Sequence, residues 1–360
     1  MSSQINEILA LTCSLISIQS TTENEAALEQ CIAIAQKELE AFTIERFDNN
    51  NHPSLLVHNQ KKGHKHFRII LNAHLDVVPG NPDQFLHIEK HGKLFARGAY
   101  DMKAAAATMI VVFKNLAKEL PYPIALQIVT DEETGSAGTR HQLAQGIRAD
   151  FVIAGECGSN LKITNKGRGT IFMKLTAKGK SAHGAYPWLG DNAYTKLHKS
   201  LTNIMEAFPA PKHPTDKTTV TITRVESNNK TFNKIPEEFT AYLDIRYSPD
   251  DKNIVDQISK MLPKDIKYEV LFTYVPLSVS EDDPYIQKLQ EAGKSVLSRE
   301  LTFRKAFGGS DMSCYAELGI PGIEFGPEGG NQHDNNEWVS IHGLERYHAI
   351  LNTFLLSLKA

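Results

Sequence analysis

The chain has 360 residues, more than the roughly 250–300 at which one hydrophobic core stops growing, so two domains are expected. Its composition, with 41% hydrophobic and 22% charged residues, is that of an ordinary globular protein. The formal net charge is −3 and the Lys and Arg residues are scattered, which argues against nucleic acid or acidic lipid as a partner.

The four cysteines (Cys13, Cys31, Cys157 and Cys314) are widely spaced, which predicts free thiols in a reducing compartment rather than disulfides or a thiolate metal site. The N-terminal stretch "MSSQINEILALTCSLI" lacks a basic start and carries Glu7, so we expect an amphipathic helix and not a signal peptide. No apolar run approaches the ~20 residues of a membrane span. We therefore expect a cytoplasmic protein that does not bind membranes.

Helix and strand patterns alternate over about the first 165 residues. Apolar residues at helical spacing predict helices over 6–18 and 23–42, the second capped by Thr21 or Thr22. Compact apolar runs that end in polar residues predict three buried strands, over 66–78, 124–135 and 149–158. This alternation indicates an α/β sheet, in which ligands gather beyond the carboxyl ends of the strands. The polar residues expected at that edge are His74, Asp76, Asp131, Glu132, Glu133 and Glu156.

The order of predicted helices and strands changes at about residue 167. The next elements read β-α-β-β-α-β, the order of a ferredoxin-like unit: 169–179, 192–208, 218–227, 238–248, 252–262 and 266–275. A helix over 283–297, a strand over 319–327 and a helix over 341–358 would then return to the first sheet. We therefore predict an α/β fold with a mixed sheet flanked by helices, formed by residues 1–166 and 277–360. Residues 167–276 would form an inserted ferredoxin-like α+β domain.

Each polar strand end has a simple structural explanation of its own. His74 and Asp76 could lie in a surface turn, Asp131–Glu133 could begin a helix, and Asp101 could cap the Ala-rich segment that follows it. Five polar positions of this kind in one sheet indicate a shared metal site instead.

Imidazole nitrogens and carboxylate oxygens are ligands that catalytic zinc sites use. Five donors would give two metals two terminal ligands each if one carboxylate bridges: His74, Asp101, Glu133, Glu156 and His333. Asp76 is then placed to accept the second ring N–H of His74 and fix its tautomer. Glu132, beside a ligand, is placed to take a proton from a water held between the ions.

Eight motifs occur in the order found in the M20 metallopeptidase family: "NAHLDVVPG", "FARGAYDMK", "TDEETGSAGTR", "AGECGS", "GKSAHGAYP", "KIPEEFTAYLDIR", "GGSDM" and "QHDNNEWV". The chain resembles this family over nearly its whole length. The family includes acetylornithine deacetylase, succinyl-diaminopimelate desuccinylase, aminoacylase and glutamate carboxypeptidase.

The resemblance implies a centre of two zinc ions per chain, for which Co²⁺ or Mn²⁺ could substitute. Asp101 would bridge the ions, with His74 and Glu156 on one and Glu133 and His333 on the other. It also implies that Glu132 is the general base, that Asp76 orients the imidazole of His74, and that the peptide bond after Asp101 is cis. The inserted domain would act as a lid and form a homodimer that contributes His183, whose imidazole would support the oxyanion.

We expect hydrolysis of an amide bond in a small N-acyl amino acid with a free carboxylate. Arg246 is the candidate for binding that carboxylate, or else a surface strand charge. Asn233 resembles a family residue that reaches the substrate, and Ser310 would lie in the substrate loop, although "GGS" can also be a plain turn. Arg168 stands alone in "KGRGT", where the desuccinylases have paired arginines, and this argues against succinyl specificity.

Other functions remain open at this point. The alternatives within the family are a di- or tripeptidase and a glutamate-type carboxypeptidase. A non-catalytic binding protein would be expected to lose ligand positions, and none is lost. A phosphoesterase with the same two metals would favour a basic cluster that the sequence lacks. Cys157, next to Glu156, is either a redox-sensitive neighbour of the metals or a small buried filler.

Overall fold

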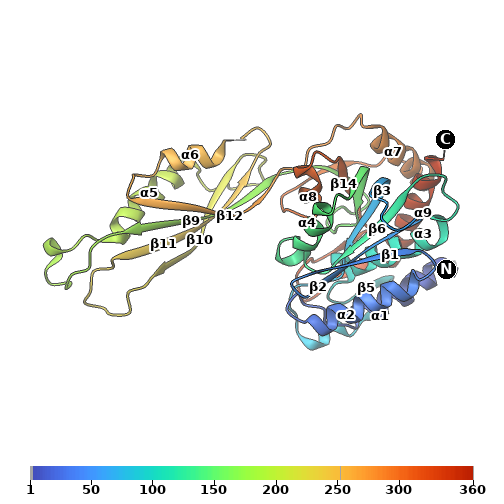
Figure 1. The fold of residues 1–360 in the computed structure, drawn as a ribbon, viewed down its shortest axis with the longest axis horizontal. Coiled ribbons are helices and arrows are strands. Elements are labelled where there is room, and N and C mark those ends of the chain that lie inside the picture. The colour runs from blue at the N-terminus through green and yellow to red at the C-terminus, as the bar shows by residue number, and fades with distance from the viewer. Residues whose placement is uncertain (1–2, 252, 360) are drawn as a thin grey trace. The chain divides into compact units, whose positions relative to one another are not determined.

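The computed structural model describes residues 3–251 and 253–359 and divides into two compact units. The larger unit comprises Met1–Lys166, Ser278–Lys305 and Ser310–Ala360, and the smaller unit comprises Gly167–Leu277 and Ala306–Gly309. The smaller unit thus interrupts the larger one in the sequence, as the colours in Figure 1 show.

The larger unit contains an eight-stranded mixed sheet in the order β1-β2-β6-β3-β7-β14-β8-β13. Its central strands β6, β3, β7 and β14 are parallel, whereas β1, β2 and β8 pair antiparallel with their neighbours. The strands are β1 (Thr43–Asn49), β2 (His52–His58), β3 (His66–His74), β6 (Ile124–Val129), β7 (Arg148–Ala154), β8 (Ile163–Gly167), β13 (Phe303–Ala306) and β14 (Gly322–Glu324). The predicted mixed sheet is confirmed.

Helices cover both faces of this sheet. Helix α3 packs on β3 and β6 and contacts α1 and α9, while α4 packs on β1 and β2 and contacts α8. Figure 1 shows α4 and α8 on one side of the central strands and α3 and α9 on the other. The helices are α1 (Ser3–Ile16), α2 (Glu25–Glu38), α3 (Ala104–Leu116), α4 (Ala137–Ala144), α7 (Pro284–Leu297), α8 (Met312–Glu317) and α9 (Ile341–Ser357).

Burial on both faces explains the apolar runs in the central strands. Ile69, Ile70 and Leu71 of β3 are fully buried, as is every residue of β6. At the carboxyl ends of β3 and β6 the apolar runs give way to polar residues, with His74 after Ala73 and Thr130 after Val129. Since β3, β6, β7 and β14 run the same way, their carboxyl ends meet at one edge of the sheet.

A second, small antiparallel sheet of the larger unit has the order β15-β16-β5-β4. Its strands are β4 (Ile88–Lys90), β5 (Lys93–Phe95), β15 (Gly329–Gly330) and β16 (Trp338–Ser340). Because β5 pairs with β16, the segment before Asp101 lies beside the segment that follows His333. This pairing joins two parts of the sequence that are more than two hundred residues apart.

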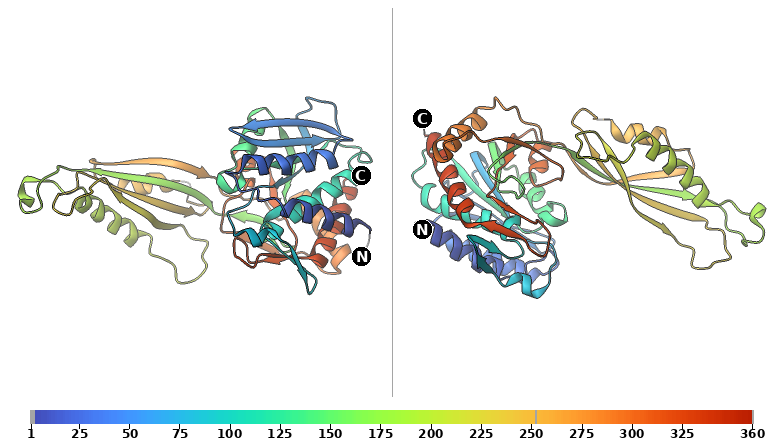
Figure 2. Two further views of the ribbon diagram at one scale, coloured as in Figure 1. Left: turned by 90° about the horizontal axis from the view of Figure 1, so that it is seen from below. Right: turned by 180° about the vertical axis from the view of Figure 1, so that it is seen from behind.

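The smaller unit is one antiparallel sheet, β10-β11-β9-β12, with two helices. Its elements are β9 (Gly169–Lys178), α5 (Ala193–Ala207), β10 (Thr219–Ser227), β11 (Glu238–Tyr247), α6 (Ile254–Lys260) and β12 (Ile266–Tyr274). Figure 2 shows both helices on the same face of the sheet, where alternate residues of β9 and β11, such as Met173 and Leu243, form the core. This is the predicted β-α-β-β-α-β order, although the predicted start of its second helix, Lys252, lies outside the described residues.

Two capping interpretations are wrong. Helix α2 begins at Glu25, and its N-cap is Asn24, whose side chain accepts a hydrogen bond from Ala27 N, rather than Thr21 or Thr22. Asp101 does not cap α3, because a π-helical segment, Ala99–Lys103, precedes the first residue of that helix. Asp101 is therefore free for another role.

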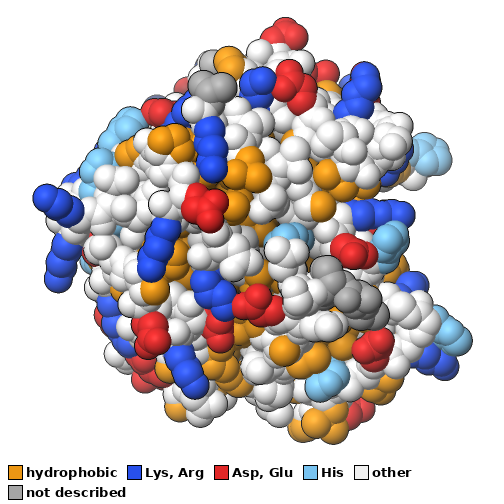
Figure 3. All heavy atoms as spheres, turned by 90° about the vertical axis from the view of Figure 1, so that its right-hand side faces the viewer, with side chains coloured by type: hydrophobic (Ala, Val, Ile, Leu, Met, Phe, Trp, Pro, Cys, Tyr) orange, Lys and Arg blue, Asp and Glu red, His pale blue; other side chains and the backbone are white. Residues whose placement is uncertain are grey.

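Surface charge follows the mixed composition of the sequence. Figure 3 shows acidic and basic side chains interspersed over one face. Within the described residues, no helix combines the length and the apolar character needed to cross a bilayer.

Candidate metal centre

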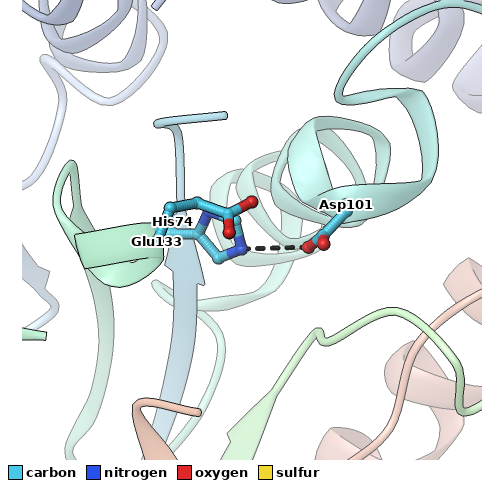
Figure 4. Close-up of side chains that lie close together, drawn as sticks. All are labelled: His74, Asp101 and Glu133. Atoms are coloured by element: carbon cyan, nitrogen blue, oxygen red, sulfur yellow. Dashed lines mark hydrogen bonds and ion pairs between the residues drawn. The ribbon is translucent and has the colours of Figure 1, made fainter. Parts of the chain in front are cut away.

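His74 is the last residue of β3 and is almost fully buried. Its Nε2 lies 3.2 Å from Asp101 Oδ1, the contact drawn in Figure 4. Its Nδ1 lies 3.0 Å from the backbone oxygen of Asp76 and 3.5 Å from the Asp76 carboxylate. The orienting contact predicted for Asp76 is thus made more closely by its carbonyl than by its side chain.

Asp101 lies in the π-helical segment before α3, with a side chain only about 5% exposed. Its two carboxylate oxygens face different imidazoles: Oδ1 faces His74, and Oδ2 lies 3.0 Å from His333 Nε2. The peptide bond between Asp101 and Met102 is cis, which confirms that prediction. A carboxylate that faces two donor groups in this way has the arrangement of a bridging ligand.

Asp76 organises the turn that carries the two glutamates after β6. Its Oδ1 accepts a hydrogen bond from Glu132 N at 3.2 Å, and its Oδ2 accepts from Glu133 N and Thr22 Oγ1, both at 3.1 Å. The fully buried Asp76 therefore fixes the backbone of the predicted base and of a predicted ligand together. The sequence suggested only its relation to His74.

Glu133 and His333 complete one side of the centre. His333 Nε2 lies 3.3 Å from Glu133 Oε1, and one donor atom each of His74, Asp101 and Glu133 lie within 4.8 Å of one another (Figure 4). The imidazole of His333 is 45% exposed, so this side is open to solvent. A neighbouring residue, Gln332, donates from Nε2 to Asp101 Oδ2 at 2.9 Å.

Glu156 follows β7 and also lies beside Asp101. Donor atoms of Asp101, Glu156 and Cys157 lie within 4.8 Å of one another, and all three residues are buried. Glu156 Oε1 is buried and has no hydrogen-bond partner. The structure thus groups His74 and Glu133 around Asp101, and separately Glu156 and Cys157.

A buried ion pair supports the segment that carries Asp101. Arg97 Nη1 donates to Glu337 Oε2 at 2.8 Å, and Arg97 Nη2 donates to the backbone oxygen of His333 at 3.2 Å. Glu337 Oε1 accepts from the backbone N–H groups of Tyr100 and Asp101, at 2.9 and 3.1 Å. Sequence reasoning missed this pair, although both residues lie inside the "FARGAYDMK" and "QHDNNEWV" motifs, because single charged residues resemble solvated surface positions.

Without metal, the centre holds protons that an ion would displace. Burial would lower the pKa of His74, but hydrogen bonds to Asp101 and Asp76 outweigh it and raise this pKa well above its ordinary value. Hydrogen bonds to Asp101 and Glu133 raise the pKa of His333 to about 10. Burial is the largest cause that raises the pKa values of Glu132 and Glu156. The charge of Glu156 raises the pKa of Glu132 further, whereas His74 opposes and Asp101 adds to the rise at Glu156. Burial would raise the pKa of Asp101, but the two imidazoles lower it.

The residues present fit divalent metal ions. Two imidazoles and the carboxylates of Glu133 and Glu156 gather around the carboxylate of Asp101, and one buried carboxylate oxygen of Glu156 has no hydrogen-bond partner. Nitrogen and oxygen donors of this kind suit zinc, and also Mn²⁺ or Co²⁺.

Three other predicted residues belong to the smaller unit. His183 and Asn233 are exposed neighbours, with Asn233 Nδ2 3.5 Å from His183 Nε2. Arg246 on β11 donates from Nε and Nη2 to the two carboxylate oxygens of Asp244, at 2.7 and 3.0 Å. The guanidinium of Arg246 is thus already hydrogen-bonded within the protein, and its Nη1 also donates to Thr170 Oγ1.

Ser310 lies in the larger unit and is buried. Its hydroxyl donates to Glu324 Oε1 at 2.7 Å, and Glu324 ends β14 at the same sheet edge as the metal-ligand candidates. The hydroxyl predicted to meet the substrate is therefore engaged within the protein.

An α/β sheet with imidazole and carboxylate donors gathered at one edge is the kind of fold and site that metal-dependent hydrolases use. The chain belongs to peptidase family M20/M25/M40, whose family model matches residues 70–357. It is accordingly a metallohydrolase of the M20 group.

A protein named succinyl-diaminopimelate desuccinylase, from Pseudoalteromonas atlantica, is 28% identical over 383 aligned residues, which cover 97% of this chain and 99% of that protein. Among solved structures, a tripeptidase from Staphylococcus aureus is similar with a TM-score of 0.80 and 20% identity, covering 99% of this chain and 98% of that one. A dinuclear metal-binding M20 peptidase from Bacillus subtilis is similar with a TM-score of 0.70 and 15% identity, covering 99% and 98%. The solved structures establish the fold that this chain shares.

Proposed function

We propose that the protein hydrolyses the amide bond of a small N-acyl amino acid, using two divalent metal ions per chain. The observation that carries the proposal is the position of Asp101, whose carboxylate oxygens face His74 on one side and His333 on the other. The Bacillus subtilis peptidase of similar fold is described as dinuclear, which supports two ions here.

The bound ions would act as Lewis acids on the amide carbonyl and make an attacking water more acidic. Glu132 would take a proton from the attacking water and pass it to the departing amine. Asp76 fixes the backbone of Glu132 beside the centre. Without metal, burial and the charge of Glu156 raise the pKa of Glu132 from its ordinary value.

The proposed ligand set keeps the assignment that the family resemblance implies. Asp101 would contribute to both sites, His74 and Glu156 would hold one ion, and Glu133 and His333 would hold the other. Zinc is the ion we propose first, with Co²⁺ or Mn²⁺ as substitutes.

Substrate binding involves the smaller unit in this proposal. Arg246 has two N–H groups beyond the three that bond Asp244 and Thr170, so its guanidinium retains donors for a substrate carboxylate. Asn233 and His183 form a polar pair, and His183 would support the oxyanion. Ser310 would contact substrate only if its hydroxyl left Glu324, so we assign it to the substrate loop rather than to direct binding.

A homodimer through the smaller unit completes the proposal. Large apolar side chains are exposed on its strands, among them Phe172, Val225, Tyr268 and Val270, and surfaces of this kind often mark interfaces. The four free thiols support a reducing compartment such as the cytoplasm.

The second candidate is a di- or tripeptidase, which the similarity to the Staphylococcus aureus tripeptidase favours. The desuccinylase relative favours the deacylase, yet Arg168 lacks the neighbouring arginine that the desuccinylases have and donates to Lys217 O and Thr219 Oγ1. We therefore propose a deacylase and do not assign succinyl as its acyl group.

The test is an amine-release assay with zinc-loaded protein on N-acetyl and N-succinyl amino acids, dipeptides and tripeptides. Release from the acyl amino acids supports the deacylase, whereas cleavage of peptides alone would replace it with the peptidase. Metal analysis of the same protein should give close to two equivalents of zinc. An active enzyme that is indifferent to chelators would overturn the metal mechanism.

A further inference from the structure

Cys157 lies at the centre rather than in the apolar core. β7 ends at Ala154, and the chain then carries Glu156 and Cys157 to the carboxyl edge of the sheet. Cys157 is 7% exposed, and its sulfur lies within 4.8 Å of a carboxylate oxygen of Asp101 and of one of Glu156. A small apolar filler would instead be expected among apolar side chains.

The turn that holds Cys157 is tied to the segment that holds Asp101. Tyr100 OH accepts a hydrogen bond from Gly158 N at 2.5 Å and donates to Asn160 Oδ1 at 3.0 Å. Gly158 has a φ of +74°, and a side chain there would collide with the guanidinium of Arg304. The backbone on both sides of the contact between Cys157 and Asp101 is therefore fixed by the fold.

The surroundings of the thiol are those of a cation site. Glu156 Oε1, which belongs to the same group of three donors, is buried and has no hydrogen-bond partner. Thiol and carboxylate donors thus gather at one buried place where a carboxylate oxygen has no hydrogen-bond partner.

The distances suit a shared ion. In a tetrahedral zinc site with Zn–S near 2.3 Å and Zn–O near 2.1 Å, the donor atoms lie roughly 3.4–3.6 Å apart. The three donors here lie within 4.8 Å, so small side-chain rotations would bring them to that separation.

We propose that Cys157 is an additional metal ligand, and that its thiolate binds the ion that Asp101 and Glu156 share. The inference rests on the metal centre of the proposed function. On binding, the thiol loses its proton to solvent and a metal–sulfur bond forms, because a coordinated thiol is deprotonated. A thiolate among oxygen and nitrogen donors favours zinc over harder ions such as Mn²⁺ and Mg²⁺.

The first test needs no variant. X-ray absorption of the zinc-loaded protein should resolve a sulfur neighbour at about 2.3 Å in addition to the nitrogen and oxygen neighbours. Two bound equivalents of zinc without any sulfur neighbour would overturn the role of Cys157 and leave the amidohydrolase proposal standing. Protein that binds no zinc would overturn both.

The second test assigns the sulfur to Cys157. Cobalt-loaded protein should show a thiolate-to-cobalt charge-transfer band that is lost in Cys157→Ser and kept in Cys31→Ser, a change at a fully buried cysteine outside the groups of metal-ligand candidates. We expect zinc binding by Cys157→Ser to weaken by at least the roughly 10–100-fold that loss of a supporting partner costs at metal sites. A band that persists in Cys157→Ser, or zinc affinity unchanged by that substitution, would overturn the proposal.

Discussion

Arg97 and Glu337 form a buried ion pair, with Arg97 Nη1 2.8 Å from Glu337 Oε2 and side-chain exposures of 3% and 1%. The pair is part of the support of the metal centre, since Glu337 also holds the backbone of Asp101, and Arg97 also holds the carbonyl of His333. Two predicted ligands from distant parts of the chain thus depend on one contact that is not itself a ligand.

Replacing Arg97 with Met should destabilise the fold by about 3–5 kcal/mol, because Glu337 would remain as an uncompensated buried charge. Urea unfolding monitored by circular dichroism would measure the change. Arg46→Met is the matched control: Arg46 pairs with Glu29 at the surface, where such a pair contributes no more than about 1 kcal/mol. Equal losses in the two variants would contradict the structural role of the buried pair.

Replacing Glu132 with Gln should reduce kcat by about 10²–10⁴ while leaving zinc content unchanged, because the substitution removes the base and no ligand. Steady-state kinetics and metal analysis of the same preparation would show the separation. Glu119→Gln, at an exposed position of the larger unit, should change neither quantity. Full activity of the Glu132 variant would rule out its role as the base.

Replacing Asp76 with Asn should weaken zinc binding by about 10–100-fold, the usual effect of losing a hydrogen-bond partner of the metal-ligand residues. Asn offers one oxygen where Asp76 now accepts from Glu132 N, Glu133 N and Thr22 Oγ1. Competition with a coloured chelator measures the affinity, and Asp83→Asn at an exposed turn is the control. If kcat fell at saturating zinc with affinity intact, Asp76 would act in the reaction and not in positioning.

Zinc affinity should rise with pH through the neutral range. The raised pKa values of His74 and His333, the latter about 10, mean that both imidazoles carry protons at neutral pH without metal. Zinc binds neutral imidazole, so each bound proton must leave, and affinity gains up to about tenfold per pH unit for each proton displaced. The gain from His333 should end near pH 10.

Calorimetry in buffers of different ionisation enthalpy would count the protons released when zinc binds. His66→Gln, which removes an exposed imidazole paired with Asp150, should leave the count unchanged. Binding that neither releases protons nor depends on pH would contradict the assignment of these histidines as ligands.

Replacing His183 with Ala should keep the zinc and lower kcat by roughly 10²–10³, the scale for loss of one oxyanion donor. If His183 acts across a homodimer, mixing this variant with Glu132→Gln subunits should restore partial activity, since some heterodimers carry one intact composite site. Subunit exchange shown by mass spectrometry, with no activity regained, would exclude a role across the interface.

The sequence by itself determined the strands and the residue types at their ends. Runs such as "RIILNA" are apolar because both faces of β3 are covered, and this burial is visible in composition alone. His74, Glu133 and Glu156 follow such runs, so the rule that parallel strands end at one edge predicts their meeting. The order of elements over 169–275 likewise determined the ferredoxin-like unit.

Only the tertiary structure decided how loops from distant segments complete the centre. The pairing of β5 with β16 brings the Arg97 segment to Glu337, and this contact depends on a register that no local pattern encodes. The same holds for Cys157: sequence placed it beside Glu156, but its distance to Asp101 follows from how Tyr100 packs against Gly158. Local periodicity reports which side chains are buried, whereas contacts between loops follow from the packing of the whole fold.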